Sequence, residues 1–335
     1  MYTAPPMRAT ILAFAILIFP NAINAQSLGI PAEAYLTTHL WGSPSAVNAK
    51  HMAMGDASVA DAHDTWHANP AAVVAVQAPT GFGAYGQTAF GLLPTFRVWG
   101  AGYAQPLAGG RVAVKATAFF VRADGPAAAL GGLQIDAAEN DVALEIGVRV
   151  ARGVRVGGGI AYLQTSSTYT APGVGVLTTL RSRPTGPGGR LGAQFSPTRW
   201  FAAGVSFDYY AERVTRGFGV LGLPDSHTRF TSSGIRAGVS FRPDAATLIL
   251  LDREELTVDS PTAQVFERAV WKIGGERRIG RVALRAGLFG RKPTGGVAVR
   301  LSATEISYVM TNRYERDLPD AGARVAHLLQ ILHRF

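Results

Sequence analysis

The stretch from Asp141 to Val150 has the sequence DVALEIGVRV, in which two kinds of residue alternate without interruption. One set contains only branched apolar residues, and the other contains acidic, basic and small residues. Successive side chains of a β-strand point to opposite sides of the sheet. This stretch therefore predicts a strand with one apolar face and one polar face.

The same alternation recurs at 111–120, 201–209 and 281–288. An Arg that faces lipid near the middle of a membrane costs about 2–4 kcal/mol, whereas an Arg in a wet lumen costs little. The face that carries Arg281 and Arg285 is therefore expected to line a lumen, with the apolar face turned outward. A secreted β-sandwich is the alternative, with the apolar faces packed in a core. The long regular strands and the Gly, Ala and Arg on the polar faces favour the membrane barrel.

Segments of about ten residues, separated by turn residues, continue to the end of the chain. They number fourteen, which is an even number as expected for a bacterial barrel of one chain. Closure into a barrel removes the unpaired strand edges that lipid would not tolerate. Tight turns should alternate with longer loops, notably at 123–138, 168–186, 214–228 and 258–263. The expected strands are 81–90, 95–105, 110–122, 139–151, 153–165, 187–196, 199–211, 229–242, 246–257, 265–277, 281–290, 295–302, 304–314 and 323–335.

A different kind of segment, 54–71, precedes the first strand and reads MGDASVADAHDTWHANPA. Asn69 suits a helix N-cap and Pro70 suits the first helical position, where its missing N–H costs nothing. A short helix through 71–76 should follow. By itself this segment could equally be a capped helix in a soluble domain.

In the context of fourteen strands, the segment resembles the N-terminal hatch of the FadL-type transporters of hydrophobic compounds, a superfamily that includes the PorV/PorQ proteins. The resemblance implies an all-β transmembrane barrel whose lumen holds a small helical hatch at 26–80, followed by the barrel at 81–335. It also implies hatch or gating roles for Gly55, Asp56, Asp64, Asn69, Pro70 and Ala71.

The two ends of the chain agree with export to the outer membrane. Arg8, a short apolar run at 11–19 and small residues before Gln26 predict a signal peptide at 1–25. The terminal Phe335 closes an alternating strand and resembles the signal that the barrel insertion machinery recognises. His327 and His333 on the same face weaken that match.

Composition restricts the chemistry. The chain contains no Cys, so thiolate catalysis, disulfides and Cys-ligated metal are excluded. Its net charge of +9 comes from dispersed Arg, which favours contacts with lipopolysaccharide, outer-membrane lipid or an anionic head group over nucleic acid. The candidate lumen charges are Arg111, Lys115, Glu145, Arg149, Asp208, Arg236, Arg281 and Arg285.

Motifs of enzymes and cofactors are weak. Gly81, Gly83 and Gly86 fit GxGxxG but begin a strand and not a strand-to-helix turn. His63 and His67 have the spacing of a zinc site without a third ligand. The sequence therefore predicts no enzyme, no cofactor and no metal.

Two functions follow from the resemblance. As a transporter, the chain would take up hydrophobic compounds such as long-chain fatty acids passively, past apolar loop residues and a shifting hatch. Lumen Arg and Lys could pair with a carboxylate head group, and Val174, Leu177, Leu221 and Leu223 could form the entrance. As a PorV/PorQ-like component of type IX secretion, it would bind secretion-system proteins instead.

Overall fold

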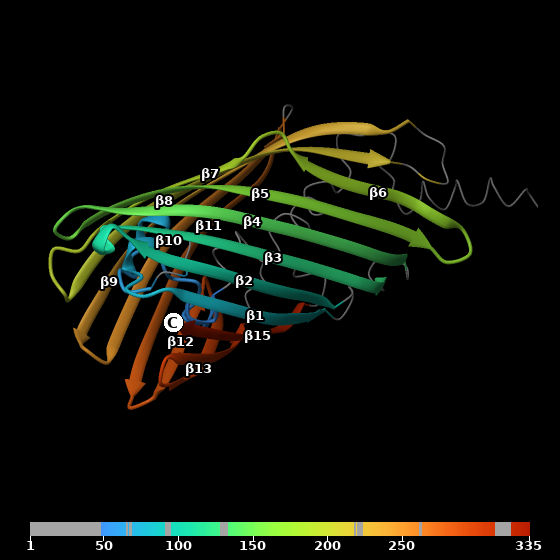
Figure 1. Cartoon of the computed structure of the whole chain (residues 1–335). Helices are drawn as coiled ribbons and strands as arrows, with labels where there is room; N and C mark the ends of the chain where they lie inside the picture. The colour runs from blue at the N-terminus through green and yellow to red at the C-terminus, as the bar shows by residue number, and fades with distance from the viewer. Residues whose placement is uncertain are drawn as a thin grey trace, which may run out of the picture.

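The computed structural model describes residues 48–64, 66, 69–90, 95–127, 133–217, 219, 224–260, 263–311 and 323–335. They form a closed antiparallel β-barrel around a small N-terminal segment (Figure 1). Among the described residues, no helix is long and apolar enough to cross a membrane. The predicted signal peptide, Leu221 and Leu223 lie outside the described residues.

Strands that follow one another in the chain pair with each other, except β6 and β7, and β1 pairs with the last strand, β15, which closes the barrel. This arrangement rules out the β-sandwich considered above. The strands are β1 (Thr80–Phe90), β2 (Phe96–Leu107), β3 (Val112–Ala127), β4 (Leu133–Ala151), β5 (Val154–Ala171), β6 (Gly175–Pro184), β7 (Gly188–Phe195), β8 (Phe201–Gly217), β9 (Ser226–Asp244), β10 (Thr247–Ser260), β11 (Ala263–Ile279), β12 (Val282–Phe289), β13 (Lys292–Leu301), β14 (Thr304–Thr311) and β15 (Ala323–Arg334).

β6 and β7 together occupy one place in the barrel wall. Both pair with β5 on one side and with β8 on the other. The break between them falls at 185–187, within the sequence Pro184–Gly188, PTGPG, where Pro187 has no N–H to donate to a ladder. Fifteen strand segments therefore make a barrel of fourteen positions, the number expected from the sequence.

The predicted long loops are shorter than expected because the strands extend into them. β6 occupies much of the predicted loop at 168–186, while β3 and β4 leave only 128–132 between them. These extensions are rich in Thr, Ser, Ala and Gly and lack a clear apolar face. The alternation of apolar and polar residues therefore did not predict these extensions. Backbone hydrogen bonds to the neighbouring strands hold them in the sheet.

The outer face of the barrel is apolar, as the alternation predicts. On β4, Val142, Leu144 and Ile146 are exposed, whereas Asp141 and Glu145 are buried inside. Aromatic residues gather on the outer face near the short turns: Tyr103, Phe195, Trp200, Phe201, Phe241 and Phe335. Such an aromatic girdle is typical of the membrane–water interface.

The outward histidines of β15 are bonded to the neighbouring strand. His327 Nδ1 lies 2.6 Å from the Tyr308 hydroxyl, and His333 Nδ1 lies 2.9 Å from Thr304 Oγ1. Phe335 is 73% exposed beside them. Its role as a signal for barrel insertion stays a prediction.

The described part of the N-terminal segment comprises α3 (Ala49–Ala53), η2 (Pro70–Ala75) and the turns between them. It lies inside the barrel, toward the end that carries η3 (Ala108–Gly110), as the blue segment of Figure 1 shows. The turns at this end are short, for example 152–153, 245–246 and 280–281. Short turns mark the periplasmic end of an outer-membrane barrel.

Candidate functional site

The hatch, defined here as the described residues between 48 and 78, rests against the barrel wall at places where the wall has no side chains. A Cβ added to Gly274 would lie 2.2 Å from the Met54 carbonyl oxygen, and one added to Gly157 would lie 2.4 Å from the Pro70 carbonyl oxygen. Both distances are far below van der Waals contact. The glycines on the polar strand faces therefore leave room for the hatch backbone.

Gly55 has the reciprocal constraint on the hatch side. Its φ is +68°, and a Cβ there would lie 2.3 Å from the Leu288 carbonyl oxygen. The hydroxyl of Thr294 accepts from the Gly55 N–H at 2.9 Å and donates to the Ala53 carbonyl at 2.9 Å. Asp56, with φ +61°, follows in the same tight turn. The Met-Gly-Asp sequence thus forms a turn that only Gly allows to approach β11 and β12.

Asn69 ties η2 to the opposite wall. Its Oδ1 accepts from the Ala71 N–H at 3.0 Å, which is the N-cap bond expected from the sequence. Its Nδ2 donates to the carbonyls of Val59, Ala193 and Val205 at 2.9, 3.1 and 3.2 Å. Pro70 occupies the start of the helix, which is a 3₁₀-helix ending at Ala75. One buried amide therefore both begins the helix and fixes it to β7 and β8.

Further wall side chains bind hatch backbone that has no secondary structure. Asp252 Oδ2 accepts from the N–H groups of Ser58 and Val59 at 2.5 and 2.9 Å. Ser240 and Gln194 donate to the carbonyls of Ala60 and Val59. Buried backbone groups need partners, and here the barrel supplies them.

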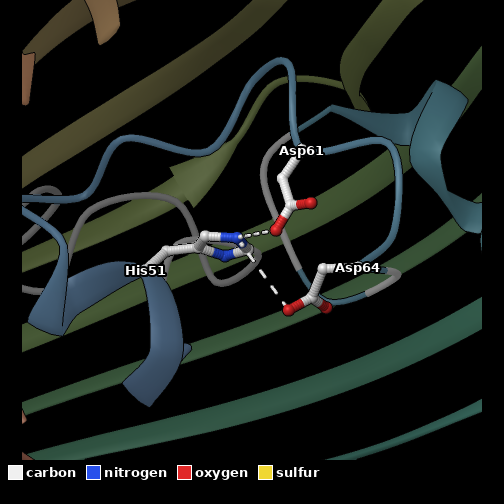
Figure 2. A group of neighbouring side chains, drawn as sticks. All are labelled: His51, Asp61 and Asp64. Atoms are coloured by element: carbon white, nitrogen blue, oxygen red, sulfur yellow. Dashed lines mark hydrogen bonds and ion pairs between the residues drawn. The ribbon is translucent and has the colours of Figure 1, made fainter. Parts of the chain in front are cut away.

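Within the hatch, a charged cluster joins α3 to the following turns. Lys50 Nζ lies 2.5 Å from Asp61 Oδ2 and 3.3 Å from Asp64 Oδ2. Figure 2 shows the His51 ring on α3 directed at both carboxylates, with distances of 3.3 and 3.9 Å. Arg242 of β9 reaches Asp61 at 3.2 Å. We call Lys50, His51, Asp61 and Asp64 the latch.

The ionised forms of the latch residues Lys50, Asp61 and Asp64 stabilise one another. Burial opposes the ionised form of Asp61, yet Lys50, His51 and Arg242 together hold the pKa of its carboxyl well below the usual range. Burial likewise opposes ionisation of Asp64, but Lys50 and His51 lower its pKa. Burial also penalises the charged form of Lys50, whereas Asp61 and Asp64 raise its pKa. Both carboxylates are therefore ionised at neutral pH and balanced by cations.

His51, Asp61 and Asp64 bring three potential metal-ligand atoms within 4.8 Å of one another. The Lys50 ammonium already contacts both carboxylates, so the position of a metal ion is filled by a protein cation. His63, singled out for its zinc-like spacing, is not a member of this group. Its partner in that spacing, His67, lies outside the described residues. The cluster is therefore suited to holding the hatch together.

Above the hatch, one side of the lumen is apolar. Phe96, Val98 and Val121 line it near the loop end, and Phe119 and Phe82 continue toward the hatch. The rings of Phe119 and Phe82 lie 5.8 Å apart, and Phe82 meets Trp66 of the hatch edge-on at 4.4 Å. We call this surface of β1–β3, β14 and β15 the apolar wall. It connects the loop end of the barrel with the hatch.

The other side of the lumen carries a belt of alternating charges. Each member contacts an opposite charge on a neighbouring strand of the wall. Glu145 of β4 reaches across β5 to Arg190 of β7, because Gly159 of β5 has no side chain and leaves space beside Glu145. Lys115–Glu145, Glu145–Arg190, Arg236–Glu254 and Glu254–Lys272 lie at 2.6, 2.9, 2.7 and 2.8 Å. Asp208 bridges Arg190 and Arg236. The charged belt is Lys115, Glu145, Arg190, Asp208, Arg236, Glu254 and Lys272.

A smaller ion-pair group continues the polar side toward the short turns. Arg285 Nε lies 2.8 Å from Glu276, and Arg285 Nη2 lies 2.7 Å from Glu305. These buried pairs join β11, β12 and β14. Together with the belt, they make the lumen amphipathic, with an apolar wall facing a neutralised charged wall.

The predicted lumen charges divide into three places. Lys115, Glu145, Asp208 and Arg236 belong to the belt, and Arg285 to the adjacent group. Arg149 lies at the short-turn mouth, whereas Arg111 and Arg281 occupy exposed positions in turns. Sequence reasoning missed Arg190, Glu254 and Lys272. Lys272 lies between Trp271 and Ile273 and could have been found by the same test, whereas Glu254 lies between two charged residues and could not. The latch pairing of Lys50 with Asp61 carried no such signal.

The overall fold resembles that of solved channels and transporters. The Pseudomonas putida toluene transporter TodX aligns with a TM-score of 0.60 and 12% identity over 86% of this chain and 98% of its own. The CymD monoaromatic hydrocarbon channel aligns with a TM-score of 0.59 and 14% identity over 87% of this chain and 98% of its own. A Pseudomonas aeruginosa FadL homologue aligns with a TM-score of 0.56 and 11% identity over 89% of this chain and 98% of its own. No protein-family model and no curated protein sequence matches the chain.

These likenesses establish a FadL-type fold. The closed barrel and its apolar outer face are those of a protein of the outer membrane. PorV or PorQ is not among the structures aligned above, and a role in type IX secretion stays a prediction.

Proposed function

We propose that this protein moves hydrophobic compounds passively across the outer membrane, along the apolar wall and past the hatch. The observation that carries the proposal is the continuity of that wall. It runs from Phe96 near the loop end to Phe82, which contacts Trp66 of the hatch. An apolar compound entering at the loops would remain in contact with apolar side chains until it reaches the hatch.

The hatch serves as the gate in this proposal. It contacts several sides of the wall through backbone and a few buried polar ties, and it does not continue as a strand of the sheet. Such a segment can shift while the barrel ladders remain intact. Long-chain fatty acids and the monoaromatic compounds named for the structural neighbours are both candidate cargo.

The test compares two adjacent phenylalanines on β3. Phe119 is buried on the apolar wall, whereas Phe120 is exposed on the outer face. We expect Phe119→Gln to reduce uptake of a radiolabelled fatty acid or monoaromatic compound in cells that lack their own channel for it. Phe120→Gln is the matched control and should keep uptake at the unsubstituted level.

Heat-modifiable migration on a gel would verify that both variants form the barrel. Uptake no greater than in cells without the protein would refute transport of the compound tested. Equal uptake by the two variants would show that the apolar wall is not the route.

A further inference from the structure

The outer face of the barrel carries a row of arginines toward the end opposite the hatch, which transport through the lumen does not use. They lie on β6, β8 and β9, where β8 pairs with both of the other strands. Each arginine is exposed and faces outward, because residues next to them in the strands, such as Ser182, Glu212 and Phe230, are buried inside. We call Arg181, Arg183, Arg213 and Arg229 the outer arginine row.

Strand register places three of these arginines directly beside one another. Arg183 of β6 is the cross-strand partner of Arg213 of β8, and Arg213 is in turn the partner of Arg229 of β9. Like charges directly opposite on one face of a sheet destabilise the pair. Two carboxylates lie on adjoining positions, Asp225 before β9 and Asp259 on β10. Within the described ranges, neither they nor any other carboxylate forms an ion pair with the row.

Outward arginines on other strands toward the same end of the barrel have acidic partners. Arg97 of β2 lies opposite Arg122 of β3, and Asp124 of β3 contacts Arg97 at 3.2 Å. Arg253 of β10 contacts Glu255 at 3.1 Å. The chain thus supplies an acid beside outward arginine on β2 and β10, whereas the charge of the outer arginine row stays available to a partner outside the chain.

The row lies at the level where lipid head groups meet the barrel. On β8 the exposed outward residues are apolar or aromatic up to Tyr209, and Arg213 follows four residues later. At a rise of about 3.4 Å per residue and a tilt of about 40°, Arg213 lies about 10 Å beyond Tyr209 along the membrane normal. On β9, Ile235 is likewise exposed below Arg229. Long arginine side chains at this height reach the head groups, while the surface below them adjoins acyl chains.

The direction of the barrel identifies the leaflet. The short turns and the hatch lie at the periplasmic end, and β6 lies toward the other end (Figure 1). The row therefore meets the outer leaflet, whose anionic lipid is lipopolysaccharide. The phosphates of that lipid are attached to sugars directly above its acyl chains. Arginine suits phosphate because its planar guanidinium donates two parallel hydrogen bonds.

We propose that the outer arginine row binds the phosphate groups of lipopolysaccharide, with the acyl chains against the apolar surface of β8 and β9 below it. A phosphate between two neighbouring guanidinium groups replaces their repulsion by charge-assisted hydrogen bonds. The contact is on the lipid side of the wall and needs no passage through the lumen. It is therefore a function beyond the proposed transport, and it fixes this side of the barrel to the outer leaflet.

The test measures lipid binding to the full chain in a neutral detergent without divalent cations. The protein is titrated with bisphosphorylated lipid A, the lipid portion of lipopolysaccharide, and native mass spectrometry counts the lipid molecules retained by each barrel. Lipid A with both phosphates removed tests the acyl chains without the charge. Phosphatidylglycerol tests a different anionic lipid.

We expect saturable binding of bisphosphorylated lipid A at a concentration about tenfold lower than that of either comparison lipid, as one strong charge-assisted contact would give. The combined Arg183→Gln, Arg213→Gln and Arg229→Gln variant should lose this preference. The matched control combines substitutions that remove the same charge from the same outer face, and it should keep the preference: Arg97→Gln, Arg122→Gln and Arg253→Gln.

Equal binding of lipid A with and without phosphates would overturn the site, as would an equal loss in the two triple variants. Binding of phosphatidylglycerol as tight as that of lipid A would overturn the assignment to lipopolysaccharide. Heat-modifiable migration on a gel shows whether each variant forms the barrel. Should the row variant not fold, salt decides on the unsubstituted protein: high salt must weaken binding of the phosphorylated lipid and not of the dephosphorylated one.

Discussion

The charged belt and a second set of inward-facing charges near the short turns occupy the same kind of strand position in different surroundings. We call the second set the mouth arginines: Arg149, Arg155, Arg242, Arg278, Arg300 and Arg334. On β4, Glu145 and Arg149 both face inward, four residues apart. The Glu145 side chain is fully buried between Lys115 and Arg190, whereas Arg149 is exposed beside another arginine. An inward charge is therefore part of an ion-pair network where the neighbouring strand supplies the opposite sign, and remains uncompensated by that strand where it does not.

The hatch lies between the charged belt and the mouth arginines. Above it, alternating charges neutralise one another and leave the apolar wall as the distinctive surface of the lumen. Below it, positive charge exceeds negative charge around an aqueous cavity. The difference indicates that the charged belt joins the strands of the barrel wall, whereas the short-turn mouth keeps an excess of positive charge.

The largest expected effect comes from breaking the belt. Replacement Glu145→Ala would leave Lys115 and Arg190 buried without the carboxylate that joins them. Loss of one partner of a buried ion pair costs about 3–5 kcal/mol. Denaturant titration of the folded barrel in detergent measures it. Glu255→Ala, which removes an exposed partner of Arg253, should cost only about 0–1 kcal/mol, and equal losses would contradict a structural belt.

A smaller effect is expected where the hatch meets the wall between the charged belt and the mouth arginines. Gly274→Ala would place a Cβ 2.2 Å from the Met54 carbonyl and force the hatch away from β11. Overpacking of this kind costs about 1–3 kcal/mol. We expect increased leakage of small solutes through the barrel, measured as conductance in planar bilayers.

The matched control for Gly274 is Gly83→Ala on β1. A Cβ at Gly83 would meet no atom within 4 Å. This variant should keep the low conductance of the unsubstituted protein. If both variants conducted alike, close packing of the hatch on glycine would not be what seals the lumen.

Acid should open the hatch only at low pH. Asp61 and Asp64 have pKa values below their ordinary 3.8, so the stability that they contribute is present above about pH 4 and is lost as pH falls through the lowered values. Lys50 has a pKa above 10.5, so its contribution is present below that pH and is lost only above the raised value.

Bilayer conductance should therefore stay flat from about pH 5 to 9 and rise in stronger acid. In a Lys50→Met variant the two carboxylates lose their nearest cation, and opening should move to higher pH. If the hatch of the unsubstituted protein opened between pH 5 and 7, a titratable group other than Asp61 and Asp64 would control its opening.

The smallest effect is expected at the mouth. Arg149→Gln removes a charge that has no carboxylate partner among the described residues and lies opposite Arg155. The free energy of unfolding should change by no more than about 0.5 kcal/mol. A loss comparable with that of Glu145→Ala would show that Arg149 is structural, and the contrast between belt and mouth would fail.

Much of the fold follows from local pattern. The alternation at 141–150 correctly predicted which residues of β4 face outward and which face the lumen. A barrel wall between lipid and water requires this two-residue period in every strand. The alternation pattern did not predict β6, because Thr178 and Thr179 place a polar residue on each face of that strand. It also placed Arg111 and Arg281 among the lumen charges, although the structure has them in turns, because alternation does not mark where a strand begins.

The hatch was only partly accessible to the same reasoning. Asn69 and Pro70 marked the start of η2, since capping is a local property of the backbone. Asn69 also donates to the wall carbonyls of Ala193 and Val205, which lie 124 and 136 residues further along the chain. Nothing in the neighbourhood of Asn69 could indicate them.

The sequence by itself determined that the chain forms a membrane barrel with polar faces inside, because the cost of a charge in lipid acts on each strand separately. Only the tertiary structure decided which inward charges are neutralised. Lys115, Arg190 and Arg149 look alike in the sequence, and their roles differ because strand register places a carboxylate beside the first two and an arginine opposite the third. Coulomb energy depends on distances between strands, which local alternation does not specify.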